Sequence, residues 1–381
     1  MPTRHGWAAL LAAACAFAVG RVFGLIELYV LGTGLLAAVL IALAIVQRPL
    51  PPIGVERITR PSMTLVGEPA RVDLEITNLG QRYTPSVDLW EPVGEHGGAP
   101  MQVARLAPSE SASAAYRVPT AHRGRLQTGP LHALRRDALG FCLRTTVLAG
   151  FDEVLVAPHH VLLPFPAVGS AGRLGQHLRM KAWGQTGTEF FSLREYVPGD
   201  DLRRINWKAS ARSTELLVRE TTSEGVRRCT VLLDTFHAEY DDEGFERAVS
   251  AAASVATSAA AAGVATRMVA DGIDLRGPEV ATRTLQWLAT VAPTPAPLDA
   301  DSLGRGAGDG LGLLVVVTGS EQSPAVSAAR SMAGPDESLI VVATQVPPAG
   351  GPFVVDATTL DRLSTTWNAL VLGAGATGTR A

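Results

Sequence analysis

The feature that most constrains this chain is an uncharged apolar run from Leu28 to Val46. A helix of this length spans the hydrocarbon core of a bilayer, which is about 30 Å thick. The run ends at Gln47-Arg48-Pro49, where a charge and a proline stop it. A shorter uncharged run, Trp7–Val19, precedes it and is broken at Gly20-Arg21. Residues 1–48 are therefore predicted to form a membrane anchor of two transmembrane helices.

The first run allows three interpretations. It can be a transmembrane helix that extends past Arg21 to Phe23, or the core of a cleaved signal peptide between Arg4 and Ala16-Phe17-Ala18. The stretch that ends at Cys15 also has a weak likeness to a lipoprotein cleavage site. We favour the two-helix hairpin because the second span follows at once.

Arginines flank the two runs unequally. Arg48, Arg57 and Arg60 follow the second run, whereas only Arg21 lies between the two. Positively charged residues near membrane spans tend to stay on the cytoplasmic side. We therefore expect the chain in the cell inner (plasma) membrane, with the bulk of its residues in the cytoplasm.

Charge and cysteine content argue against several classes of protein. A net charge of -3 gives no electrostatic reason to expect nucleic acid as a partner. The three cysteines, Cys15, Cys142 and Cys229, are scattered and form no disulfide framework or zinc motif. This pattern fits a reducing compartment, with Cys142 and Cys229 as small buried apolar residues.

Residues 49–166 carry the alternating pattern of β-strands. In Arg71–Asn78 the apolar side chains occupy every second position and share one face. Asp137 and Gly140 predict a turn that the aspartate caps. Short strands at this spacing predict an immunoglobulin-like β-sandwich, interpreted as a spacer because it holds no cluster of titratable residues. Further candidate strands are Val87–Leu89, Ala112–Val118 and Phe151–Pro158.

Polar residues concentrate between Gly187 and Glu220. Pro198-Gly199 fits the centre of a tight turn, and Asp200 or Asp201 fits the N-cap of a helix that begins near Leu202. A strand is then predicted at Glu215–Glu220.

A glycine-rich and basic stretch, Gly169–Gly187, precedes these elements. It lacks the Gly-Lys-Ser/Thr ending of a phosphate loop, so we interpret it as a mobile connector. Residues 167–225 as a whole are predicted to connect the β domain to the last domain.

Fixed residue types at fixed spacing give this segment a family resemblance. The run Arg194–Asp201 is followed by Arg203, Ile205, Trp207-Lys208, Ala211-Arg212 and Leu217–Glu220, and together these resemble the signature of DUF58, a bacterial domain of unknown function. A weaker second signature of that family resembles Arg136–Phe141. The resemblance implies paired amino-terminal spans, a von Willebrand factor A domain and, as partner, a MoxR-type AAA+ ATPase.

The same segment supplies the candidate partner-binding residues. A surface that combines charge with an aromatic ring suits protein recognition. An alternative is that these side chains pair with one another and join the two domains. The candidates are Arg194, Glu195, Tyr196, Pro198, Gly199, Asp200, Asp201, Arg203, Trp207, Lys208 and Arg212.

Residues 226–381 alternate between short apolar runs and helical stretches. Such alternation predicts a largely parallel sheet with helices on both faces. The predicted fold is multidomain: an N-terminal transmembrane helical hairpin, a β-sandwich-like domain and an α/β von Willebrand factor A-like (Rossmann-like) domain. Predicted strands include Cys229–Leu233, Val264–Val269, Leu311–Val317 and Leu339–Ala343, and predicted helices include Phe245–Ala262, Thr282–Ala289, Ala325–Met332 and Leu360–Val371.

The resemblance also implies a divalent-cation site, built from Asp-x-Ser-x-Ser, a threonine and a second aspartate. Here the first motif is Asp234-Thr-Phe-His-Ala238, and the later loop contains Thr318-Gly319-Ser320. Two hydroxyls and one carboxylate are missing from the oxygen ligands that Mg²⁺ prefers. We therefore expect a degenerate site at Asp234 and Thr318, with no functional metal and no cofactor.

Three function classes remain. A membrane-anchored cytoplasmic adaptor or scaffold, bound to a MoxR-type ATPase in cell-envelope or complex-assembly processes, is the leading hypothesis. A purely structural envelope scaffold is the second. The third is an enzyme that uses the acidic residues Glu195, Asp200 and Asp201, but these have no Ser/His or Cys/His nucleophile beside them. We therefore predict that the protein is not an enzyme.

Overall fold

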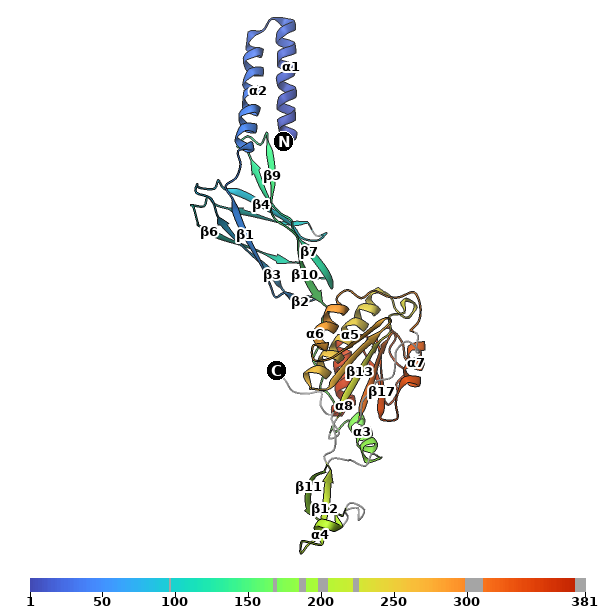
Figure 1. Ribbon diagram of the computed structural model, residues 1–381. Coiled ribbons are helices and arrows are strands. Elements are labelled where there is room, and N and C mark those ends of the chain that lie inside the picture. The colour runs from blue at the N-terminus through green and yellow to red at the C-terminus, as the bar shows by residue number, and fades with distance from the viewer. Residues whose placement is uncertain are drawn as a thin grey trace. The chain divides into compact units, whose positions relative to one another are not determined.

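The computed structural model describes residues 1–95, 97–166, 170–184, 190–197, 205–221, 226–298 and 311–373 (Figure 1). Their contacts divide the chain into two compact units, one from Met1 to Ala157 and one that begins at Pro158. The first unit contains the apolar helices and a β domain, and the second contains a mixed α/β sheet.

The first unit begins with a hairpin of two helices, α1 (Arg4–Phe23) and α2 (Ile26–Gln47). Their 20 and 22 residues correspond to about 30 and 33 Å of helix. Both are long and apolar enough to cross a membrane, as the sequence predicts. The buried positions of α1 are all glycine or alanine at helical spacing, which lets the two helices pack closely.

The β domain contains two antiparallel sheets that pack face to face. One sheet has the order β1 (Ile53–Arg60), β3 (Ala70–Asn78) and β6 (Ser111–Val118). The other has the order β5 (Gly98–Val103), β4 (Val87–Pro92), β8 (Leu131–Arg136) and β9 (Leu143–Ala149). A third sheet joins β2 (Met63–Leu65), β10 (Asp152–Ala157) and β7 (Gly124–Thr128).

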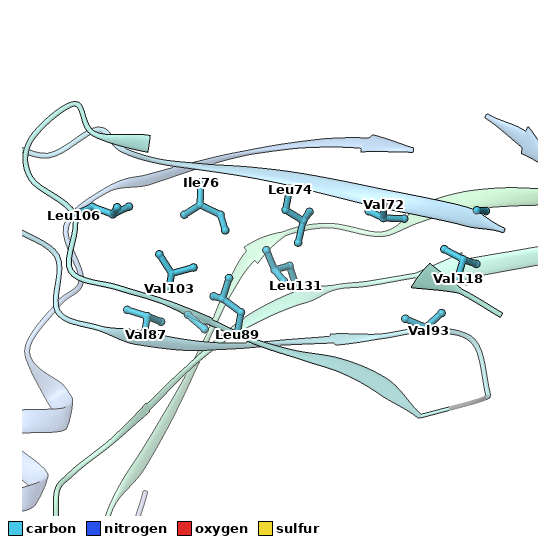
Figure 2. Close-up of a cluster of buried hydrophobic side chains, with 12 residues drawn as sticks. Val72, Leu74, Ile76, Val87, Leu89, Val93, Val103, Leu106, Val118 and Leu131 are labelled. Carbon is cyan, nitrogen blue, oxygen red and sulfur yellow. The ribbon is translucent and has the colours of Figure 1, made fainter. Parts of the chain in front are cut away.

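The core of this domain follows from the alternation in β3. Val72, Leu74 and Ile76 are buried and point toward Val87 and Leu89 of the opposite sheet (Figure 2). Alternate residues of a strand point to opposite faces, so the polar residues between them remain partly or fully exposed. The capped turn is also confirmed: Gly140 has a φ of 71°, and Asp137 accepts from the backbone N–H groups of Leu139 and Cys142.

One arginine of the topology argument has a different role from the one expected. Arg57 is not a charge beside the membrane, because its side chain is only 8% exposed and forms an ion pair with the buried carboxylate of Glu91. Burial raises the pKa of Glu91, and the Arg57 guanidinium opposes this shift. Arg57 therefore serves as the partner of a buried carboxylate, and losing either member would leave an uncompensated buried charge.

The second unit is organised on a six-stranded sheet. Its order is β15-β14-β13-β16-β17-β18, with every pairing parallel except that of β14 with β15. Numbered from the first strand of this sheet, the order is 3-2-1-4-5-6, that of doubly wound folds. The strands are β13 (Arg228–Leu233), β14 (Ala265–Ala270), β15 (Ile273–Arg276), β16 (Gly312–Thr318), β17 (Glu337–Ala343) and β18 (Val354–Asp356).

Helices cover both faces of this sheet (Figure 1). Helix α7 (Pro324–Met332) packs on the face that carries Leu232 and Val316. Helix α5 (Asp242–Ala261) lies against β13 and β14, and the two acidic residues of its first turn interact favourably with the helix dipole. Contacts also join α5 to α6 (Val280–Leu288) and α8 (Leu360–Leu372).

The stretch expected as a mobile connector contains a packed helix. Helix α3 (Arg173–Gly184) contacts α8, and its Leu174 and Leu178 side chains are fully buried. The four-residue spacing of those leucines is the sequence signal that indicates an amphipathic helix here. The prediction of a connector is therefore wrong for this part of the stretch.

Residues 158–166 also belong to the second unit. The expected boundary stood after residue 166. In the structure, Ser254 of α5 accepts a hydrogen bond from the backbone N–H of Val161, and Trp367 of α8 donates to the carbonyl of Pro164. These bonds hold the segment against α5 and α8.

Candidate functional site

The segment with the family resemblance forms a two-stranded hairpin, here called the signature hairpin. Strand β11 (Phe190–Glu195) pairs antiparallel with β12 (Leu217–Thr221). The strand expected at Glu215–Glu220 is therefore present, with slightly shifted ends. The chain between the two strands returns to β12, because Ile205 forms a β-bridge with Val218.

The helix of this hairpin is shorter than predicted. Helix α4 spans only Trp207–Ser210, and Asn206 is its N-cap, with the side chain accepting from the N–H of Ala209. The prediction of a helix through Ile205 and Asn206 is wrong, because pairing with β12 holds both residues in non-helical conformations. The proposed caps, Asp200 and Asp201, lie outside the described residues.

Apolar and basic side chains are exposed together at one end of the signature hairpin. Trp207 is 65% exposed and Leu216 is 41% exposed. Backbone hydrogen bonds hold this end together: the N–H of Tyr196 donates to the carbonyl of Leu216, and the N–H of Asn206 donates to that of Leu217. Val197 is also exposed at this end.

Two of the predicted basic residues lie beside this apolar group. Lys208 follows Trp207 on α4, and Arg212 is in the next turn; both are exposed. Neither forms an ion pair within the part of the chain that the structure describes. The signature hairpin thus exposes a tryptophan, a leucine and two cations that have no ion pair among the described residues.

The remaining predicted residues divide into two groups. Glu195 and Tyr196 are described: Glu195 is exposed and Tyr196 half-buried. A hydrogen bond and like charge from Glu195 raise the pKa of Glu215. Arg194 lies in β11, opposite Val218. Pro198, Gly199 and Arg203, like both aspartates, lie outside the described residues.

A second candidate site lies at the carboxyl ends of β13 and β16. These neighbouring strands mark the point where the strand order reverses, and open α/β sheets bind ligands outside this edge. Asp234 follows β13, and Thr318 ends β16. Both side chains are almost fully buried.

Protein donors satisfy both carboxylate oxygens of Asp234. Its Oδ1 accepts from the backbone N–H of Phe236 at 3.1 Å. Its Oδ2 accepts from the hydroxyls of Thr318 and Ser323, each at 2.8 Å. Asp234 therefore fastens the loop after β13 to the end of β16 and to the start of α7, where Ser323 is the N-cap.

Two further residues surround this carboxylate. The Tyr240 hydroxyl donates to the Asp234 carbonyl at 2.8 Å, and burial raises its pKa well above the usual value. Burial, and then the charge of Asp234, raise the pKa of Glu239, although a hydrogen bond with Ser323 opposes this. The cluster is anionic, and its donors are hydroxyls and backbone groups.

The residues here do not fit the five-oxygen cation site that an A-type domain would have. Phe236 and Ala238 offer no side-chain oxygen. A side chain at Gly319 would collide with the backbone, because its Cβ would lie 2.0 Å from the Glu239 carbonyl oxygen. No group of three or more His, Cys, Asp or Glu side chains in the described part of the chain is arranged to hold a metal.

Sequence reasoning found Asp234 and Thr318 but missed Ser323 and Tyr240. The signal for Ser323 was local, since Ser-Pro at the start of an apolar helix is a typical N-cap and N1 pair. No sequence signal placed the Tyr240 hydroxyl on the Asp234 carbonyl.

The comparisons with known proteins bear on both sites. Residues 192–293 match the family model "Protein of unknown function DUF58". The matched stretch begins within β11, includes β13 and Asp234, and ends shortly after α6. Both candidate sites have residues in it.

No curated protein matches the chain by sequence. The CARDB domain of the PF1109 protein from Pyrococcus furiosus matches by structure with 16% identity, over 29% of this chain and 89% of that one, at a TM-score of 0.22. β-Glucosidase 3B from Thermotoga neapolitana matches with 13% identity, over 27% of this chain and 16% of that one, at a TM-score of 0.17. TM-scores this low support no conclusion about fold or function.

Proposed function

We propose that this chain is a membrane-anchored, non-enzymatic adaptor whose bulk lies in the cytoplasm and whose signature hairpin binds a protein partner. The partner that the DUF58 resemblance favours is a MoxR-type AAA+ ATPase, in cell-envelope or complex-assembly processes. The observation that carries the proposal is the 65% exposure of Trp207 beside exposed Leu216, Lys208 and Arg212.

An exposed tryptophan ring is an unfavourable feature for a hairpin that serves only to join domains, because its apolar surface stays in contact with water. A tryptophan buries much apolar surface when it enters a pocket on a partner, and such residues dominate the energy of protein interfaces. If the segment served mainly to join the two domains, Trp207 would be expected in a core.

The arrangement at Asp234 supports a non-catalytic role for the sheet edge. A catalytic carboxylate needs an oxygen free to accept a proton or to contact a substrate. Here both oxygens accept hydrogen bonds from Phe236, Thr318 and Ser323. The 3-2-1-4-5-6 strand order and the position of Asp234 support an A-type domain whose cation site has been replaced by protein donors.

The test is capture of the ATPase by the purified full chain in mild detergent. Trp207→Ala should abolish capture, while circular dichroism shows an unchanged fold. Phe151→Ala is the matched control, because Phe151 is an equally exposed aromatic residue (64%) in the β domain. Unchanged capture by Trp207→Ala would exclude the hairpin as the binding surface. Absence of capture by the wild-type chain would favour the purely structural scaffold.

Topology has a test of its own. Alkaline phosphatase fused after Ala381 should be inactive, because this enzyme needs the oxidising periplasm to fold. An active fusion would place the α/β unit outside the cytoplasm and remove the ATPase as a partner.

A further inference from the structure

The two ends of the helical hairpin meet at the same end of the β domain. Before α1, Pro2 forms a β-bridge with Cys142, and the N–H of Thr3 donates to Phe141. After α2, the guanidinium groups of Arg144 and Arg135 donate to the carbonyls of Gln47 and Arg48, at 2.5 and 2.7 Å. Figure 1 shows the amino terminus beside β9, next to the end of α2. This end of the β domain is therefore where the polypeptide leaves the apolar helices.

Five arginines gather at this place, here called the arginine collar. Arg135 and Arg144 are partners across β8 and β9, so they share one face of the sheet. All but the half-buried Arg135 are exposed. None of the five forms an ion pair with a carboxylate in the ranges that the structure describes. The collar consists of Arg4, Arg48, Arg135, Arg136 and Arg144.

Within the collar, Arg48 and Arg144 repel Arg135. Burial, and then the charges of Arg48 and Arg144, lower the pKa of Arg135. The nearest carboxylate, Asp137, is turned inward, where its oxygens accept the N–H groups of Leu139 and Cys142. Among the residues that the structure describes, no carboxylate pairs with the collar, and a bound anion would relieve the repulsion.

A cavity of about 940 Å³ opens beside the collar. Arg4, Arg136 and Arg144 line it, together with His5, and Asp137 is the one acidic residue of the lining. This volume is enough for a ligand of headgroup size.

Apolar side chains place the cavity at the height of a membrane surface. Trp7 lies one turn into α1 and is 63% exposed, and Leu139 at the tip of the capped turn is also 63% exposed. Tryptophan concentrates where the hydrocarbon core meets the headgroups. With α1 and α2 across a membrane, the collar lies in the headgroup layer, where phosphate is the abundant anion.

We propose that the arginine collar binds the phosphate of anionic phospholipids and so fixes the β domain against the membrane surface. Arginine suits this ligand, because its planar donors pair with phosphate oxygens. The proposal rests on α1 and α2 crossing a membrane, and it is independent of the protein partner.

The test uses native mass spectrometry of the detergent-solubilised full chain. Phosphatidylglycerol and phosphatidylcholine are added in turn, and the fraction of protein with bound lipid is measured. We expect selective retention of phosphatidylglycerol. Arg4→Gln/Arg136→Gln should weaken it by about 25-fold, at about fivefold for each arginine removed. Neither side chain is hydrogen-bonded within the described residues, so this variant should keep its fold, as circular dichroism can verify.

The matched control is Arg71→Gln/Arg117→Gln. These two exposed arginines lie on β3 and β6, outside the collar, so the control removes the same charge without changing the lining of the cavity. Equal loss of lipid in the control, or equal retention of both lipids by the wild type, would overturn the proposal. So would displacement of phosphatidylglycerol by inorganic phosphate at the same concentration, because the site would then bind free phosphate and not a lipid.

Discussion

The Asp234 loop and the signature hairpin are both polar in sequence, yet they use their polar residues in opposite ways. At Asp234, a buried carboxylate accepts one backbone N–H and two hydroxyls, and little of it faces solvent. On the hairpin, Trp207, Lys208 and Arg212 are exposed. The difference shows that residue type alone does not identify a recognition surface. What matters is whether the fold itself supplies the partner of each group.

The largest effect that would test this comparison is the loss of the Asp234 carboxylate. Asp234→Ala leaves the hydroxyls of Thr318 and Ser323 and the N–H of Phe236 without their acceptor. Leaving buried donors unsatisfied should cost about 3 kcal/mol in the free energy of unfolding. The loss of stability is measured by unfolding the full chain with urea in detergent and monitoring hydrogen exchange in β13 and β16. Asp271→Ala, at an exposed turn, is the control and should change stability by less than about 0.5 kcal/mol. Equal values would mean that Asp234 is not structural.

A second substitution asks whether the missing cation site can be restored. Gly319→Asp returns the second carboxylate of an A-type site, but its Cβ would lie 2.0 Å from the Glu239 carbonyl oxygen. Overpacking of this kind should destabilise the α/β unit by about 1 to 3 kcal/mol. Calorimetric titration with Mg²⁺ should show no micromolar binding by the variant or the wild type. Tight binding that disappears in Asp234→Ala would show that other oxygens complete the site.

The signature hairpin offers a matched pair of apolar residues: Val218 lies in β12, and Leu216 directly precedes this strand. Val218 is 2% exposed, whereas Leu216 is 41% exposed. Val218→Ala removes two buried methyl groups and should destabilise the hairpin by about 1 to 2 kcal/mol. Leu216→Ala should change stability by less than about 0.5 kcal/mol and act on partner capture instead. Hydrogen exchange in β11 measures the change in stability for each variant. A larger loss in Leu216→Ala than in Val218→Ala would mean that the exposed end is part of a core.

The smallest expected effect is a pH dependence from Glu239. Its pKa is raised in the folded state, so the folded protein holds this proton more tightly than the unfolded chain does. The contribution of Glu239 to the free energy of unfolding is largest below its ordinary pKa of 4.5, and it falls as the pH rises from that value through the raised pKa of the folded state. Glu239→Gln should flatten the fall of stability above pH 4.5. An unchanged pH profile would show that burial and the charge of Asp234 do not raise the pKa of Glu239.

Much of the fold could be predicted from the sequence, because local patterns determined it. Length and hydropathy predicted α1 and α2, and period-two alternation predicted β3. Short, largely apolar runs predicted the parallel strands β13 and β16. In each case the pattern reflects the solvent that a segment faces, which is a property of the segment itself.

Tertiary structure alone decided which polar groups meet. Arg57 looks like a juxtamembrane charge until β4 brings Glu91 beside it. Asp200 and Asp201 fit a helix start in sequence, yet β12 captures Ile205 and moves the cap to Asn206. Ser323 reaches Asp234 across 89 residues. The sequence determined the apolar and polar faces of each element; only the paired strands brought distant donors and acceptors within hydrogen-bonding distance, since such bonds need contact at about 3 Å.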